Sequence, residues 1–75
     1  MKEKQFIKLW EKAEDKKQPR KIFLDPQNYV VADTYIITDD DVVKLYRVAL
    51  QVAVLQISDI HYVTNYDSLE YKFIE

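Results

Sequence analysis

The chain contains no glycine among its 75 residues. Glycine is the residue that most readily adopts positive backbone φ angles, so any turn that needs such an angle must use a costlier residue. Phosphate-binding loops and the strained turn that presents a hydrolase nucleophile both depend on glycine. The chain also lacks cysteine and has one histidine, His61, so zinc sites and thiol or serine–histidine catalysis lose most of their side chains. We therefore predict a protein that is not an enzyme and has no catalytic residue, metal site or cofactor.

The remaining composition predicts a single small domain over residues 1–75. Hydrophobic residues make up 48% of the chain, with six Tyr, three Phe and one Trp, which is too apolar for a disordered protein. No signal-type apolar segment follows the charged first residues, and the longest apolar stretch, residues 42–57, is interrupted by Lys44 and Arg47. We expect a soluble, cytoplasmic protein that does not bind membranes.

Codon bias offers one explanation for the missing glycine. Phe, Tyr, Met, Ile, Asn and Lys together outnumber Gly, Ala, Arg and Pro by 28 to 8. That imbalance is typical of an A+T-rich genome, so a low-GC bacterium or one of its phages is the expected source.

Residues 3–17 have the pattern of an amphipathic helix. Phe6, Leu9, Trp10 and Ala13 recur at spacings of three and four and form one apolar stripe. Pro19 ends the helix, because the residue before a proline is driven out of the α region.

Two strands are predicted next, at residues 21–24 and 29–37. The intervening Asp25-Pro26-Gln27-Asn28 has the residue types of a tight turn. Residues 29–37 are rich in Val, Ile and Tyr. Asp33 interrupts an otherwise apolar row of that strand, which indicates a bulge, a strand edge or a site.

Residues 39–57 favour a second helix. Thr38 and Asp41 fit a helix-capping pattern, and three aspartates complement the positive end of a helix dipole. Twelve of the sixteen residues from 42 to 57 are apolar, with no turn residue among them, and a strand of that length would exceed the usual range. The five valines in this stretch leave open the alternative of two strands.

A terminal hairpin over residues 60–74 completes the predicted fold, with Asn65 or Asp67 supplying any positive φ. The fold class is therefore a small two-layer α+β domain with a largely antiparallel sheet and two helices. The predicted element order is α-β-β-α-β-β.

The apolar second helix leads to the functional prediction. Leaving about five aliphatic side chains in water would forgo on the order of 10 kcal/mol, so either the rest of the monomer or another chain must cover them. We predict a protein–protein interaction module, homodimeric or bound to another protein, with an accessory or inhibitory role. The predicted protein-binding residues are Asp39, Asp40, Asp41, Tyr46, Leu50 and Val54.

Uneven charge along the chain supports two alternatives. Residues 1–24 carry eight basic and four acidic side chains, whereas residues 25–75 carry three basic and nine acidic ones. The basic half could bind nucleic acid through Lys4, Lys8, Trp10, Lys12, Lys16, Arg20 and Lys21. The acidic half could instead imitate DNA and inhibit a DNA-binding protein through Asp39 to Asp41.

Overall fold

The computed structural model describes residues 1–13 and 19–66 of the chain. Within these residues the fold is α+β, with one α-helix and two antiparallel three-stranded sheets. The elements in chain order are α1 (Glu3–Lys12), β1 (Arg20–Asp25), β2 (Asn28–Ala32), β3 (Thr34–Ile37), β4 (Val42–Arg47), β5 (Leu50–Gln56), the 3₁₀ turn η1 (Ile57–Asp59) and β6 (Tyr62–Asn65).

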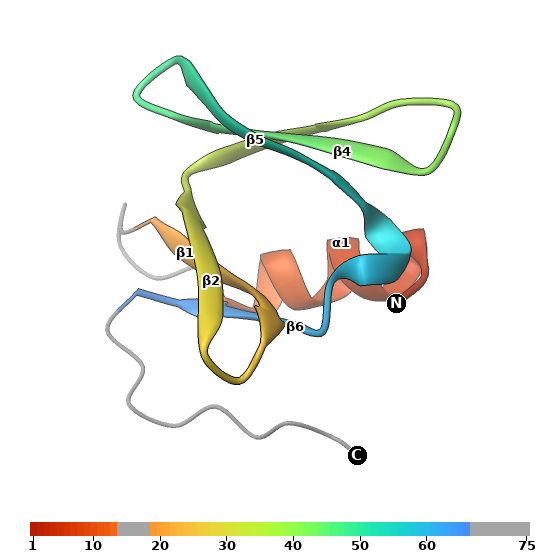
Figure 1. Ribbon diagram of the computed structural model, residues 1–75, viewed down its shortest axis with the longest axis horizontal. Coiled ribbons are helices and arrows are strands. Elements are labelled where there is room, and N and C mark those ends of the chain that lie inside the picture. The colour runs from red at the N-terminus through yellow and green to blue at the C-terminus, as the bar shows by residue number, and fades with distance from the viewer. Residues whose placement is uncertain (14–18, 67–75) are drawn as a thin grey trace.

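The two sheets are joined by chain segments that pass from one to the other. The first sheet has the order β2-β1-β6 and the second has the order β3-β4-β5. A break at Asp33 separates β2 from β3, so one extended run contributes a strand to each sheet, and η1 connects β5 back to β6. In Figure 1 the β4–β5 hairpin lies across the top, with β1, β2 and β6 below it and α1 behind them.

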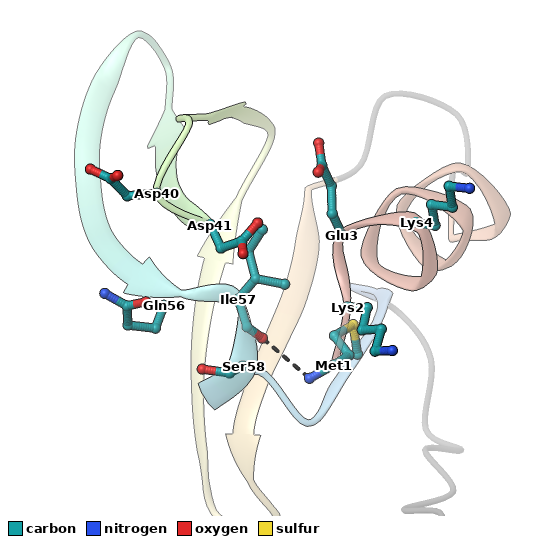
Figure 2. A pocket seen from close by; sticks show the side chains of 9 residues that line it. All are labelled: Met1, Lys2, Glu3, Lys4, Asp40, Asp41, Gln56, Ile57 and Ser58. Carbon is teal, nitrogen blue, oxygen red and sulfur yellow. Dashed lines mark hydrogen bonds between the residues drawn. The ribbon is translucent and has the colours of Figure 1, made fainter.

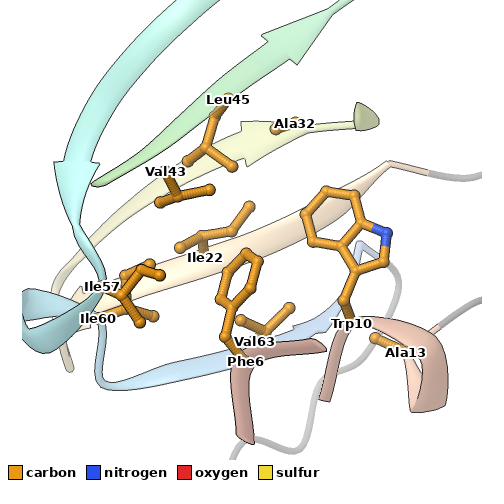
Figure 3. Packing of buried hydrophobic residues seen from close by; sticks show 10 residues of the cluster. All are labelled: Phe6, Trp10, Ala13, Ile22, Ala32, Val43, Leu45, Ile57, Ile60 and Val63. Carbon is orange, nitrogen blue, oxygen red and sulfur yellow. The ribbon is translucent and has the colours of Figure 1, made fainter. Parts of the chain in front are cut away.

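The hydrophobic core fills the space between α1 and the inner faces of both sheets. Phe6 and Trp10 point from α1 toward Ile22 of β1 and Leu45 of β4 (Figure 3). Tyr35 of β3 packs edge-on against both aromatic rings, with its ring centroid 5.1 Å from Phe6 and 4.8 Å from Trp10. The apolar stripe predicted for the first helix is confirmed, since its four residues all pack in this core.

The predicted helix over residues 39–57 is wrong, because this segment forms the β4–β5 hairpin. Val43 pairs with Leu55 and Lys44 with Val54 in antiparallel register. The chain reverses at Val48 and Ala49, whose φ angles are 50° and 65°. Positive φ at both central residues is typical of the two-residue turns that close β-hairpins, normally built from Asn or Gly. Neither residue type is present here, so this turn has no local signal in the sequence.

The N-terminal capping predicted at the same place is also wrong. Thr38 instead donates from its backbone N–H to the carbonyl oxygen of Val42 at 2.9 Å, which closes the turn between β3 and β4. Asp41 occupies the positive-φ position of that turn, at 57°. Asp and Asn are the non-glycine residues that most often accept this conformation, so the aspartate triplet serves a turn and not a helix.

The predicted single sheet is wrong, because the strands divide between two three-stranded sheets, whereas the strands predicted before and after residues 39–57 are confirmed in part within the described residues. The strand at 21–24 is confirmed within β1, and the strand at 29–37 is present as β2 and β3, divided at Asp33. Asp25 closes the β1–β2 turn by accepting hydrogen bonds from the backbone N–H groups of Gln27 and Asn28. The first strand of the predicted terminal hairpin is β6, and the second lies outside the described residues, as do residues 14–17 of the predicted first helix. The element order α-β-β-α-β-β is corrected accordingly, to one helix followed by six strands in the described part of the chain.

No helix in the part of the chain that the structure describes is long and apolar enough to cross a membrane.

Candidate protein-binding surface

The side of the β3-β4-β5 sheet that faces away from the core carries exposed aliphatic residues on either side of a lysine. Ile36, Lys44 and Val54 lie side by side across the three strands, because Ile36 pairs with Lys44 and Lys44 pairs with Val54. Val52 precedes Val54 by two residues and so shares its side of β5, and half-buried Tyr46 lies on the same side of β4 as Lys44. We call these five residues the outer face.

The aliphatic residues of the outer face are substantially exposed. The exposed fraction is 52% for Ile36, 45% for Val52 and 49% for Val54. Single exposed apolar residues are common, but a contiguous apolar patch marks interaction surfaces more often than the rest of a protein surface. Covering the exposed half of these three side chains would contribute roughly 1 kcal/mol each.

The turn between β4 and β5 extends this apolar surface at one end. Val48 is 79% exposed and Leu50 is 71% exposed. The turn is attached to the rest of the fold by Asp33, whose Oδ2 accepts a hydrogen bond of 2.9 Å from the backbone N–H of Val48. That hydrogen bond lowers the pKa of the Asp33 carboxyl below its ordinary value. The interruption predicted at Asp33 is therefore a break between two strands, and the Asp33 side chain supports the β4–β5 turn.

The β5 strand also has a free backbone edge. Among the residues that the structure describes, β5 is an edge strand that pairs with β4 alone. Its seven residues, Leu50–Gln56, include no charged residue and no proline. Natural edge strands are usually protected from pairing with another chain by charge, proline, bulges or short length. Of these protections β5 has one, a register irregularity opposite Leu45 and Tyr46, near its beginning.

The structure brings some of the predicted protein-binding residues together and separates others. Tyr46 and Val54 lie on the outer face, and Leu50 lies beside the β4–β5 turn. Asp39, Asp40 and Asp41 are exposed in the β3–β4 turn, at the other end of β4 from Leu50. The sequence reasoning missed Ile36, Val48 and Val52. Ile36 could have been found from its place in an alternating strand, but the two valines required knowledge of the hairpin.

A cleft lies between the start of α1, the β3–β4 turn and η1 (Figure 2). Its volume is about 760 Å³, and its lining includes Lys2, Lys4, Asp40 and Asp41. The backbone amine of Met1 donates to the carbonyl oxygens of Ile57, at 3.3 Å, and of Ile60, at 3.2 Å. These contacts tie the first residue to η1. The lining mixes both charge signs, so the cleft presents no clear preference for an anion or a cation.

The residues predicted for nucleic-acid binding do not form one surface with an aromatic platform. Lys4, Lys8 and Lys12 are exposed along α1, whereas Trp10 is only 7% exposed and packs in the core. Arg20 covers the Trp10 ring, with its guanidinium carbon 4.5 Å from the ring centroid, and its Nε donates to the Trp10 carbonyl oxygen at 3.1 Å. Trp10 therefore cannot stack on a base without unfolding this contact.

Of the two remaining basic residues predicted to bind nucleic acid, the structure describes Lys21. Lys21 lies on β1 with its Nζ 5.1 Å from the ring centroids of both Tyr29 and Tyr66, which favours the ammonium group electrostatically. Lys16 lies outside the described residues.

Comparison with models of protein families, with curated proteins and with solved structures finds no match to this chain.

Proposed function

We propose that this protein is a non-enzymatic protein–protein interaction module that binds its partner through the outer face of the β3-β4-β5 sheet. The observation that carries this proposal is the exposure of Ile36, Val52 and Val54 on one side of a small sheet, with Lys44 between Ile36 and Val54. With Val48 and Leu50 included, the exposed aliphatic surface corresponds to on the order of 6 kcal/mol of burial. Association itself costs roughly 4–15 kcal/mol of lost freedom, so this burial favours binding but must be supplemented by polar contacts.

The surroundings of the outer face fit a protein partner. Lys44 and Tyr46 add a cation and a hydroxyl to the aliphatic surface, and Asp39 to Asp41 lie in the turn that precedes β4. An apolar centre with a polar rim is the usual anatomy of a protein interface. An accessory or inhibitory role, in which the module acts by occupying a partner's surface, belongs to the same proposal.

The test is a charge placed in the centre of the outer face. Val54→Glu should leave the fold intact, because the Val54 side chain is half exposed, and should abolish binding. Gln27→Glu adds the same charge in the exposed β1–β2 turn and serves as the matched control. Immobilised wild type and both variants are incubated with a cell lysate, retained proteins are identified by mass spectrometry, and self-association is measured by sedimentation.

Binding by the wild type and Gln27→Glu, together with its loss in Val54→Glu, supports the proposal. The proposal fails if the wild type binds neither itself nor another protein, or if Val54→Glu binds as well as the wild type does. Thermal melting followed by circular dichroism establishes that both variants are folded.

Nucleic-acid binding is the second candidate, and the exposure of Lys4, Lys8 and Lys12 on α1 is what favours it. Such binding would rest on phosphate contacts and would weaken steeply with salt. Retention of the wild type on heparin at low salt, and its loss in a Lys4→Gln, Lys8→Gln and Lys12→Gln triple variant, would support this candidate. The acidic-mimic alternative predicts instead that a basic protein is captured and that Asp39 to Asp41 are required.

A further inference from the structure

We infer that this chain also binds a second copy of itself, and that the two copies pair antiparallel along their β5 strands. The inference goes beyond the proposed function, because this pairing uses the backbone edge of the β3-β4-β5 sheet and leaves the outer face exposed. Such pairing would join the two sheets into one six-stranded sheet around a twofold axis. The argument starts from the direction of the backbone groups of β5.

The hydrogen bonds at the end of β5 show which of its backbone groups face outward. The N–H of Ile57 donates to the carbonyl oxygen of Asp41 at 2.9 Å. Hydrogen-bonded and non-hydrogen-bonded pairs alternate along an antiparallel ladder, so the Leu55–Val43 pair is bonded and the Gln56–Val42 and Val54–Lys44 pairs are not. The N–H and C=O groups of Val54 and Gln56 therefore point away from β4, toward the free edge.

These outward groups match those of a second copy. With the twofold axis at Val54, each Val54 exchanges two backbone hydrogen bonds with its counterpart, and each Gln56 pairs with Val52 of the other copy. Residues 53–56 lie in the regular part of β5, whereas Val52, the partner of Gln56, lies at the register irregularity. The side chains keep their faces in this register, because residues directly opposite one another lie on the same side of a sheet.

Charge is compatible with this pairing. No charged side chain of β5 meets its own copy, because β5 has none. The nearest like charges on the outer face are the two Lys44 ammonium groups, which would be three strand spacings apart, or about 14 Å. This separation exceeds the screening length of about 8 Å at physiological ionic strength. An edge strand that contained a lysine or aspartate near the axis would instead bring like charges together.

The contact area predicts a weak affinity. In this register five residues of β5, 52–56, face β5 of the other copy and form a strip about 17 Å long, which buries on the order of 700 Å² in total, in the range of weak, transient contacts. We therefore expect a weak, reversible dimer. Sedimentation of the wild type over a concentration series should show the mass rising from that of one chain to that of two.

Gln56 allows the backbone pairing to be tested without altering the outer face. Its φ angle is −72°, which is already within the range that proline requires. Gln56→Pro removes one outward N–H from each copy, whereas Gln56→Ala removes the same side chain and keeps the N–H. The dimer then loses two hydrogen bonds, and each one changes the dimerisation constant by a factor of roughly five. We therefore expect Gln56→Pro to dimerise about 30-fold more weakly than Gln56→Ala.

A disulfide tests the register independently. The chain has no cysteine, so Val54→Cys introduces one thiol per copy, and the paired α-carbons would lie about 5.5 Å apart, within the range for a disulfide. Val48→Cys is the control, since Val48 is more exposed but lies at the β4–β5 turn, away from the axis. Mild oxidation should cross-link Val54→Cys much faster than Val48→Cys.

The possible results separate this inference from the proposed function. A concentration-dependent dimer, weakened by Gln56→Pro and cross-linked through Val54→Cys, supports pairing along β5. A wild type that stays monomeric up to about 500 μM, equal dimerisation of the two Gln56 variants, or equal cross-linking of the two cysteine variants overturns it. A monomer that still captures another protein in a Val54-dependent way overturns the second copy and leaves the proposed function standing.

Discussion

The β4–β5 turn predicts a substitution that should stabilise the protein. Val48 and Ala49 both have positive φ, at 50° and 65°. A β-branched residue is especially disfavoured there, because its side chain crowds the backbone. Replacing the pair by Asn-Gly gives the turn the residues that this geometry favours most in natural hairpins. The backbone N–H of residue 48, which donates to Asp33, is retained.

The expected gain follows from the two backbone conformations. The left-handed region costs an L-residue roughly 1–2 kcal/mol, so the native pair carries about 3 kcal/mol of local cost. Glycine returns roughly 0.5–1 kcal/mol of this, because it increases the conformational freedom of the unfolded chain. Little burial is lost, since both residues are exposed. The free energy of unfolding should therefore rise by about 2 kcal/mol, which corresponds to roughly 8–16 °C in Tm for a domain of this size.

Thermal and urea denaturation of the wild type, Val48→Asn, Ala49→Gly and the double variant would measure this gain. In a helix over the same residues, the two substitutions would instead destabilise the protein by about 1 kcal/mol, chiefly through glycine. The sign of the change therefore distinguishes the hairpin from the helix. A double variant no more stable than the wild type would refute the argument that this turn is strained.

Three further predictions concern the support of the turn, the core and the basic helix. Asp33→Ala should lower the free energy of unfolding by about 1 kcal/mol at neutral pH. Asp33→Asn keeps an acceptor for the Val48 N–H and should lower it by less. Because the Val48 N–H lowers the pKa of Asp33, the stability that the carboxylate contributes is present above its unfolded pKa of about 3.9 and is lost as the pH falls through the lower folded value. The difference in urea stability between wild type and Asp33→Ala should accordingly be largest above about pH 5 and shrink toward pH 3. Phe6→Ala should lower the free energy of unfolding by about 3–5 kcal/mol, because Phe6 is fully buried. Much of the chain should then be unfolded when it is measured by circular dichroism. A helical signal equal to that of the wild type would contradict the packing of α1. Addition of single-stranded oligonucleotide should leave Trp10 fluorescence unchanged because Arg20 and the core cover the ring, and strong quenching would revive a stacking role for Trp10.

The sequence predicted the elements whose signals are local. The apolar stripe of α1 recurs with helical period, and the β1–β2 turn contains Asp25 and Pro26 between two strands of high β-propensity. The side chain of Asp25 then caps that turn, which is the behaviour expected of aspartate at such a position. In these segments local preference and the final fold agree, so the sequence was sufficient.

Residues 42–57 could not be assigned for the opposite reason. Their turn lies at Val48 and Ala49, which locally disfavour it, and it is supported by a carboxylate fifteen residues earlier in the chain. A local pattern cannot report a contact of that kind. Tyr46 and Val54 were nevertheless identified as candidates, because a large excess of apolar residues in a small chain requires cover in either conformation. The strand register was needed to show on which side of the sheet Tyr46 and Val54 lie. It was also needed to show that Ile36 and Val52 lie on the same side.

The β4–β5 hairpin combines two unfavourable features that single substitutions would remove. Asparagine at residue 48 would relieve the turn, and threonine or lysine at residues 52 and 54 would protect the edge and the outer face. An A+T-rich genome would account for a missing glycine but not for a missing asparagine at the turn, because asparagine codons are themselves rich in A and T. Proteins tend to retain local conflicts of this kind where function requires them. The turn substitution and Val54→Glu separate the two features. If the hairpin is retained for binding, relieving the turn should raise stability and preserve binding, whereas Val54→Glu should preserve stability and remove binding.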